Sequence, residues 1–349
     1  MNSDIMRNFR NRKFAAVVLP LMAAALLFAM NLFYGSVDIP AGDVLDILLG
    51  GEPQRESWRV ILLQSRLPQA VVALLCGMAL SAAGLMLQTL FNNPLAGPEV
   101  FGINSGAGLG VAVVMLLMQG SVTAGGMSIG GYLAVLAGAF LGALLIIAVI
   151  LLFSMVLRGN VFLLIAGMAL SYLASSVISL LNYFATAEGV HSYLIWGMGN
   201  FGGISSGQLP LFALLIVASL FASLLMMKPL NALLLGRAYA ENLGVNVKRV
   251  RGLLLLLTGF LTAVVTAYCG PISFIGLAVP HIARLMLGTN NHRLLVPSTL
   301  FTGGCVALLC NFVCMLPGGG AVVPLGAVTP LVGAPVIIYV VLKGRGRFS

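Results

Sequence analysis

Long apolar runs separated by short polar connections make up most of the chain. They lie at about 14–34, 66–90, 101–119, 131–157, 161–184, 208–227, 250–268, 272–288, 294–316 and 326–342. A helix needs roughly 20 residues to cross about 30 Å of hydrocarbon. The pattern therefore predicts an all-α integral membrane protein with about ten transmembrane helices in one transmembrane domain, residues 1–349. Membrane β-barrel strands alternate apolar and polar positions, so these continuous runs exclude that class.

Two stretches depart from this simple pattern. The run at 272–288 is short and contains Pro280 and His281, which predicts a broken or half-buried helix. Glu188 and His191 fall in an expected external loop, and the Gly-rich stretch 196–203 that follows predicts a short or re-entrant helix. We interpret His191 as an ordinary loop residue, with contact to a metal chelate as the alternative.

Composition and charge set the orientation. Hydrophobic residues are 60% of the chain, charged residues 8%, and the mean hydropathy is +1.07. With the N-terminus inside, only Arg55, Arg59 and Arg66 of the 18 basic residues fall outside. This distribution follows the positive-inside rule and predicts a multi-pass protein with both termini cytoplasmic. The net charge of +9 then reports orientation, with lipid rather than nucleic acid as the expected partner.

The sequence contains few patterns that indicate catalysis or metal binding. The chain contains neither G-x-x-x-x-G-K-[ST] nor H-E-x-x-H, and its acidic residues fall in loops or at span ends. Ion-coupled carriers usually keep an ionisable group near the middle of the membrane. We therefore predict a non-catalytic membrane protein that binds no cofactor and draws its energy from another protein, with an ion-coupled carrier or a passive channel as alternatives. Cys310 and Cys314 share a helical face but lack further ligands, so we expect packing and no metal site.

The segment from Met227 to Gly252 is too polar to cross the bilayer. Pro229 should stop the preceding helix, and Asn231 could cap a short helix. Gly236 could break that helix, and Gly244 could end a second one. We expect two short helices on the inner membrane surface, at about 230–244. They could dock a partner, or form only a solvated loop that sets topology.

Several motifs resemble those of one family. They are Ser65-Arg-Leu-Pro-Gln69, Gly84-Leu-Met-Leu-Gln88, Asn93-Pro-Leu-Ala-Gly-Pro98, Leu230-Asn-Ala-Leu-Leu-Leu-Gly236, the run from Gly270 to Arg284, and Gly333-Ala-Pro335. Together they are similar to the FecCD-type permeases of bacterial ABC importers for iron-siderophores, haem and cobalamin, over nearly the whole chain.

The resemblance implies a type II ABC importer permease in the bacterial inner membrane that works as a homodimer. It also implies a periplasmic binding protein and cytoplasmic ATPase subunits that hold ATP and Mg²⁺. The segment near 230–244 would couple to the ATPase. The implied coupling residues are Asn231, Leu235, Gly236, Arg237, Ala240, Leu243 and Gly244.

The resemblance also implies a cytoplasmic gate and an outer docking surface. The gate positions are Asn93, Pro94, Leu95, Gly159, Asn160 and Val161. Spans 5 and 10 are the implied lining of the pathway. For docking of the binding protein, Arg66 matches the family, and Arg55 or Arg59 could contribute.

Three positions depart from the family pattern at this outer surface. Gln69 and Met315 stand where such permeases carry arginine, and Asn311 stands where an aspartate is common.

Overall fold

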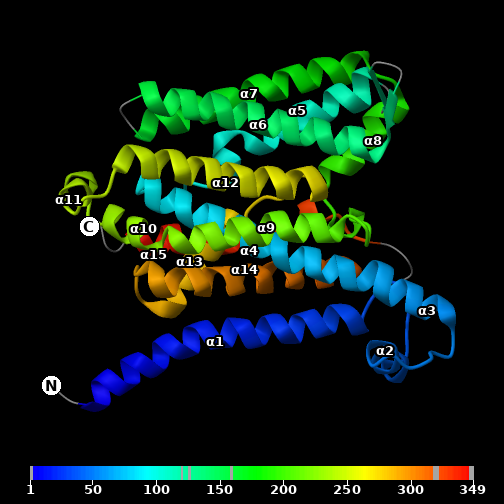
Figure 1. The fold of residues 1–349 in the computed structure, drawn as a ribbon, viewed down its shortest axis with the longest axis horizontal. Coiled ribbons are helices and arrows are strands. Elements are labelled where there is room, and N and C mark those ends of the chain that lie inside the picture. Colours follow the sequence, from blue (N-terminus) through cyan, green and yellow to red (C-terminus); the bar gives the residue numbers. More distant parts are fainter. Residues whose placement is uncertain (1–2, 119–120, 125–126, 158–159, 317–321, 346–349) are drawn as a thin grey trace. The chain divides into compact units, whose positions relative to one another are not determined.

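The computed structural model describes residues 3–118, 121–124, 127–157, 160–316 and 322–345. These residues form two compact units, which we describe separately. Unit 1 comprises residues 1–82, 201–220 and 274–349, and unit 2 comprises residues 83–200 and 221–273. The boundaries at 82/83 and 220/221 fall within the helices α4 (Leu67–Phe91) and α9 (Leu209–Leu225). Figure 1 colours the chain by residue number.

Unit 1 contains long helices and a short helical outer segment. Besides its parts of α4 and α9, its elements are α1 (Ser3–Phe33), α2 (Ala41–Leu48), α3 (Glu56–Ile61), the π-helical turn η1 (Leu62–Arg66), the 3-10 turn η4 (Phe201–Gly203), α13 (Ile275–Leu287), α14 (His292–Met315) and α15 (Leu325–Arg345). Helix α1 runs beside α14 (Figure 1). Helices α4 and α14 approach closely at Gly77. A Cβ on this residue would lie only 2.1 Å from the Gly303 carbonyl oxygen, so the contact leaves no room for a side chain.

Unit 2 contains the remaining elements. They are the 3-10 turn η2 (Pro98–Phe101), α5 (Ile103–Ala112), the π-helical turn η3 (Val113–Leu117), β1 (Ser121–Ala124), β2 (Met127–Gly130), α6 (Tyr132–Val156), α7 (Asn160–Phe184), α8 (Ala187–Gly197), α10 (Met227–Leu233), α11 (Arg237–Asn242) and α12 (Val247–Cys269). Helix α6 packs against α5 and α12.

Glycines set the spacing of α5 and α6. A Cβ on Gly110 would lie 1.9 Å from the Gly138 carbonyl oxygen, and one on Gly106 would lie 2.6 Å from that of Gly142. A side chain cannot occupy either place, so the G-x-x-x-G pattern at 106–110 allows this close helix contact.

The fold class agrees with the prediction of an all-α membrane bundle. Within the described residues, six helices are long and apolar enough to span a membrane, and the bent pair α9–α10 makes a seventh. Three shorter apolar helices, at Ile103–Leu117, Ile275–Leu287 and Leu325–Val340, fall where spans 3, 8 and 10 were expected. The prediction of one permease domain, and the orientation of the termini, stay predictions.

Two local predictions need correction, and one pair of elements was not predicted. The antiparallel pair β1–β2 lies in the connection between the apolar runs at 101–119 and 131–157, for which no element was predicted. The expected loop around Glu188 and His191 is helix α8, whose N-cap is Thr186; its hydroxyl accepts a hydrogen bond from the Gly189 N–H at 3.3 Å. That capping threonine, with Glu188 in the first turn, is the signal that could have predicted the helix.

The second span also begins earlier than the sequence suggested. It was expected from about Arg66, but helical structure runs from Glu56 to Phe91. Pro68 has no N–H to bond the carbonyl four residues before it, and the wide π-helical turn η1 lies at that point. The turn lets the helix continue across the proline.

Candidate functional site

The polar segment after α9 folds into two short helices, as the sequence predicts. We call residues 226–246 the elbow. Helix α9 ends at Leu225, and α10 continues at an angle of 49° to it. Pro229 explains the position of the bend, because it cannot donate a hydrogen bond to the carbonyl of Leu225. Pro229 itself lies in the first turn of α10, where a proline is tolerated.

The prediction that Asn231 caps the first short helix is wrong. Helix α10 begins at Met227 with Met226 as its N-cap, so Asn231 lies inside the helix. Because Pro229 is tolerated in the first turn of α10, the helix begins before it, and the N-cap Met226 lies five residues N-terminal to the expected cap Asn231.

Two glycines end the short helices as expected. Gly236 has φ +96° and separates α10 from α11, and Gly244 has φ +80° and follows α11. A side chain at either residue would be strained, because L-residues rarely adopt this backbone conformation. No atom lies within 4 Å of where a Cβ would be at either glycine, so both sit in open space.

The elbow exposes large apolar side chains between charged ones. Leu235, Tyr239 and Leu243 are 61%, 53% and 58% exposed. They recur every fourth residue, a spacing that could have identified Tyr239, which the sequence prediction left out. Ala240 was expected among the contact residues but is 0% exposed, because it faces the interior of unit 2. The most exposed apolar side chains of the elbow are therefore Leu235, Tyr239 and Leu243, and Leu234 is exposed beside them.

The charges of the elbow lie around this apolar surface. Arg237 Nε donates to Glu241 Oε1 at 3.0 Å, and both side chains are about half exposed. Just after the elbow, Lys248 and Arg249 are exposed in the first turn of α12, which Asn246 caps by accepting the Arg249 N–H at 3.0 Å. The elbow and the start of α12 thus expose large apolar side chains among charged ones. Such a surface favours docking of a partner protein over the alternative of a solvated loop.

The inner turn after α4 is fixed by one asparagine. Asn93 Oδ1 accepts the Leu95 N–H at 2.9 Å, and its carbonyl oxygen accepts the Ala96 N–H at 3.1 Å. Pro94 and Leu95 form the outside of this turn, and Leu95 is exposed. The turn predicted as one half of the gate is therefore present, and its gating role stays a prediction.

The other half of the expected gate is only partly described. Gly159 lies outside the described residues. Asn160 and Val161 are helical and form the first turn of α7, and the Val161 side chain is exposed.

Arg66 is not at the surface, where docking of a binding protein would need it. It is 5% exposed, and its guanidinium donates to the carbonyl oxygens of Leu32 (2.9 Å), Phe33 (3.1 Å) and Val37. These carbonyls lie at and just beyond the C-terminal end of α1, where a helix leaves carbonyls without partners. The geometry favours a structural role for Arg66 within unit 1.

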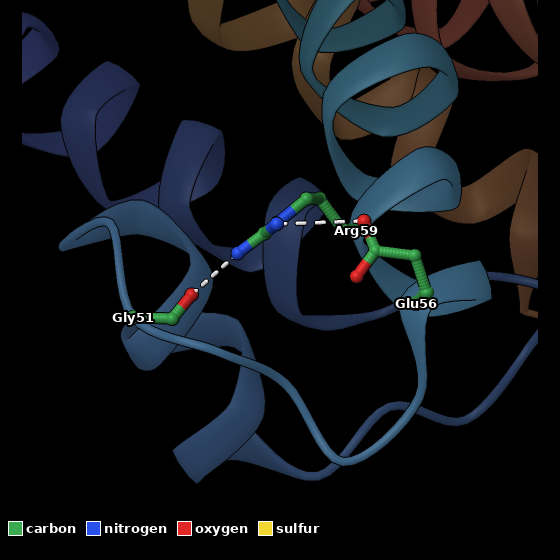
Figure 2. Close-up of polar contacts among 3 residues, drawn as sticks. All are labelled: Gly51, Glu56 and Arg59. Atoms are coloured by element: carbon green, nitrogen blue, oxygen red, sulfur yellow. Dashed lines mark hydrogen bonds and ion pairs between the residues drawn. The ribbon is translucent and has the colours of Figure 1, made fainter.

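Arg55 and Arg59 lie nearer the surface. Figure 2 shows Arg59 between the Gly51 carbonyl, 2.7 Å away, and the Glu56 carboxylate, 3.4 Å away. The Arg55 guanidinium lies over the ring of Trp58 at 5.3 Å from its centroid. Arg59 is thus held by its own segment, and of the three arginines Arg55 presents its charge most freely.

Two of the residues that depart from the family pattern contact each other. Gln69 Nε2 donates to Asn311 Oδ1 at 2.9 Å, and Asn311 Nδ2 donates to Asn31 Oδ1 at 2.7 Å. Asn31 Nδ2 in turn donates to the Leu308 carbonyl at 3.1 Å. These neutral amides join α1, α4 and α14, so Gln69 and Asn311 pair within unit 1. Met315 is the last residue of α14.

The remaining candidates give no second site. All five cysteines are free thiols, and among the described residues no group of three or more His, Cys, Asp or Glu could hold a metal ion. His281 is buried in α13 beside Pro280, and His191 is exposed on α8.

Comparison with known proteins decides the family. A model of the FecCD transport family matches residues 22–343. The chain belongs to the FecCD transport family. The resemblance carried by the motifs is therefore confirmed.

Individual relatives agree over almost the full length. The vitamin B12 import system permease protein BtuC of Klebsiella pneumoniae is 35% identical over 338 residues, which cover 97% of this chain and 96% of that protein. The protein of the same name from Salmonella typhi is 38% identical over 280 residues, 80% of this chain and 83% of its own.

Two solved structures share the fold. An inward-facing conformation of a metal-chelate type ABC transporter has a TM-score of 0.81 and 27% identity, covering 94% of this chain and 98% of its own. PsaBC from Streptococcus pneumoniae in complex with Fab has a TM-score of 0.51 at 17% identity, which supports the fold alone. This FecCD family member is thus a multi-pass membrane permease of the ABC importer class.

Proposed function

We propose that this permease is the membrane subunit of an ATP-driven importer that moves an iron-siderophore, haem or cobalamin chelate from the periplasm to the cytoplasm. The elbow is the observation that carries the proposal. It exposes Leu235, Tyr239 and Leu243 in a segment that also carries Lys228 and Arg237, and the chain contains no phosphate loop of its own. A separate ATPase that seats on the elbow supplies the energy.

A corrinoid is the first cargo to test. The relatives from Klebsiella pneumoniae and Salmonella typhi are both called vitamin B12 import system permeases. A siderophore or haem remains in the same class of large chelates, and a periplasmic binding protein would select among them. ATP and Mg²⁺ bind to the ATPase in this proposal, and the permease itself binds no cofactor.

We further propose that the permease works as a pair of identical subunits, with α7 facing the pathway. In the most apolar stretch of α7, between Val161 and Phe184, only 17% of the residues are buried. Its exposed surface carries Ser175, Ser176 and Ser179, with Ser179 Oγ bonded to the Ser175 carbonyl at 2.9 Å. Hydroxyl groups suit a helix interface or an aqueous passage better than lipid tails.

Reconstitution tests the proposal. The permease is placed in vesicles with or without a co-expressed ATPase and binding protein, and uptake of cobalamin, haem and a ferric siderophore is measured. We expect uptake only with the ATPase and ATP. Uptake without nucleotide hydrolysis would instead establish the passive channel or the ion-coupled carrier, and collapse of the ion gradient would distinguish these two.

The apolar surface of the elbow can be tested directly. Replacing Leu235 and Leu243 by aspartate puts two charges into the proposed interface, and we expect ATPase binding to weaken by roughly a hundredfold. The matched control replaces Leu48 and Leu49, exposed leucines at the end of α2, in the same way. Pull-down of the ATPase from detergent measures the effect. Equal binding by both double variants contradicts the proposed interface.

A further inference from the structure

Unit 2 contains a cavity of about 650 Å³ that no step of the proposed transport uses. Its walls come from α8, the beginning of α6, the end of α12 and the turn η3. This volume is in the range of small-molecule sites. In the predicted topology all of these wall segments lie on the outer side of the membrane.

Backbone contacts hold the walls together. The Asn200 N–H donates to the Cys269 carbonyl at 2.8 Å, which ties the chain after α8 to the end of α12. At the same place, a Cβ on Gly270 would lie 2.5 Å from the Trp196 carbonyl oxygen. At the other end of α8, a Cβ on Gly189 would lie 3.5 Å from the Met115 carbonyl oxygen. The cavity is therefore part of the folded unit.

The lining combines one carboxylate with aromatic rings. Glu188 is the charged residue of the lining, the aromatic residues are Tyr132, Trp196 and Tyr268, and the hydroxyls come from Thr186 and Ser192. None of the described residues of the lining is Lys, Arg or His, although the chain carries a net charge of +9.

Next to the cavity, Tyr193 packs on Trp196 with ring centroids 6.1 Å apart. Burial raises the pKa of the Tyr193 phenol, so this ring stays neutral.

These groups select for positive charge. The face of an aromatic ring is electrically negative and attracts a cation, and an ammonium group gains most from this when it is partly removed from water. A carboxylate at the rim adds attraction. An anion would meet Glu188 with no compensating cation in the lining, and a purely apolar ligand would gain nothing from the carboxylate.

We propose that this cavity binds a small organic cation through its ammonium or quaternary ammonium group. The cation lies against the aromatic rings, with its charge toward Glu188. Free amines outside the cell and the amine headgroups of phospholipids share this chemistry. The proposal concerns the permease alone and does not depend on its cargo or on an ATPase.

A pair of ligands that differ only in charge tests the proposal. Choline and its neutral isostere 3,3-dimethylbutan-1-ol are titrated onto the purified permease in detergent, with binding measured by calorimetry and by Trp196 emission. The chain has two tryptophans, so Trp58→Phe leaves Trp196 as the single reporter. We expect choline to bind about three- to thirtyfold more tightly than the alcohol. Equal affinities, or no heat and no emission change with choline, would overturn the proposal.

Variants locate the binding. Glu188→Gln should weaken choline binding about fivefold, since an exposed ion pair contributes roughly 1 kcal/mol. Glu52→Gln removes an exposed carboxylate on the same predicted side but in unit 1, and should leave the affinity unchanged. Tyr268→Leu should weaken binding without abolishing it, because two aromatic rings remain. If Glu188→Gln and Glu52→Gln weaken binding equally, the attraction is only general surface charge and the site is not the cavity.

Nanodiscs distinguish the source of the cation. The permease is placed in discs of phosphatidylglycerol or of phosphatidylethanolamine, and choline is titrated into both. At an ionic strength that screens the negative surface of phosphatidylglycerol, weaker choline binding in phosphatidylethanolamine shows that the lipid headgroup competes for the cavity. Equal binding in the two lipids shows that the site takes the free cation. Absence of choline binding in both kinds of disc contradicts the proposal.

Discussion

The elbow and the segment from Gly51 to Arg66, which we call the outer segment after its predicted side of the membrane, both carry arginines, but their charges are used differently. In the outer segment the guanidinium groups of Arg59 and Arg66 bond backbone carbonyls of their own unit. In the elbow, Arg237 pairs with Glu241 at the surface, and leucines lie exposed beside it. Two segments with similar charge in the sequence therefore offer very different surfaces to a partner.

The difference comes from how each helix end satisfies its carbonyls. Helix α1 ends without a glycine turn, and its last carbonyls bond Arg66 instead. The short helices of the elbow end in turns, in which the Gly236 N–H bonds the Leu233 carbonyl at 3.1 Å and the Gly244 N–H bonds that of Glu241 at 3.0 Å. The exposed leucines of the elbow, Leu235 and Leu243, therefore stand beside helix ends that the backbone itself closes.

The largest effect is expected at the glycine of the elbow. Gly236→Trp forces a strained backbone and places a large ring in the open space at the proposed ATPase surface. We expect ATP-dependent uptake to fall by roughly a hundredfold or more, measured in vesicles with the ATPase present. Gly207→Trp is the control, because Gly207 also has no atom within 4 Å of its Cβ position but has an ordinary φ. Full uptake by the Gly236 variant would show that the elbow does not couple.

A smaller effect, on stability, is expected in the outer segment. Arg66→Met leaves three carbonyls without the guanidinium, so we expect the free energy of unfolding to fall by about 2–4 kcal/mol. Thermal denaturation in detergent measures the change.

A second substitution tests the same contact from the other side. A Cβ on Gly35 would lie 2.7 Å from Arg66 Nε, so Gly35→Ala should also destabilise the protein. Gly42→Ala, with open space around it, should not. If Arg66→Met is as stable as the parent and instead loses affinity for the binding protein, Arg66 docks a partner after all.

The smallest effect is expected at the ion pair of the elbow. Glu241→Gln removes an exposed i,i+4 pair, which contributes roughly 0.3–0.5 kcal/mol. We expect a change in unfolding free energy of this size at low salt and none at high salt, with ATPase binding unchanged. A larger loss of binding would place Glu241 itself in the interface and sharpen the contrast with the outer segment.

Much of the fold was predictable because it depends on local patterns. Apolar runs of the right length predict membrane helices, and Pro229 and Gly236 predict an interruption. The amide contacts between Gln69 and Asn311 could not be predicted, since the two residues are 242 positions apart in the chain.

The sequence by itself determined the class of this protein: the length and hydropathy of its runs, its charge distribution and its ordered motifs belong to a membrane permease. Only the tertiary structure decided which side chains are available. It buried Arg66 and Ala240, exposed Leu235, Tyr239 and Leu243, and gathered Glu188, Trp196 and Tyr268 around one cavity. Whether a side chain is exposed depends on which residues from distant parts of the sequence pack against it. The order of apolar and polar residues along the chain does not reveal those contacts.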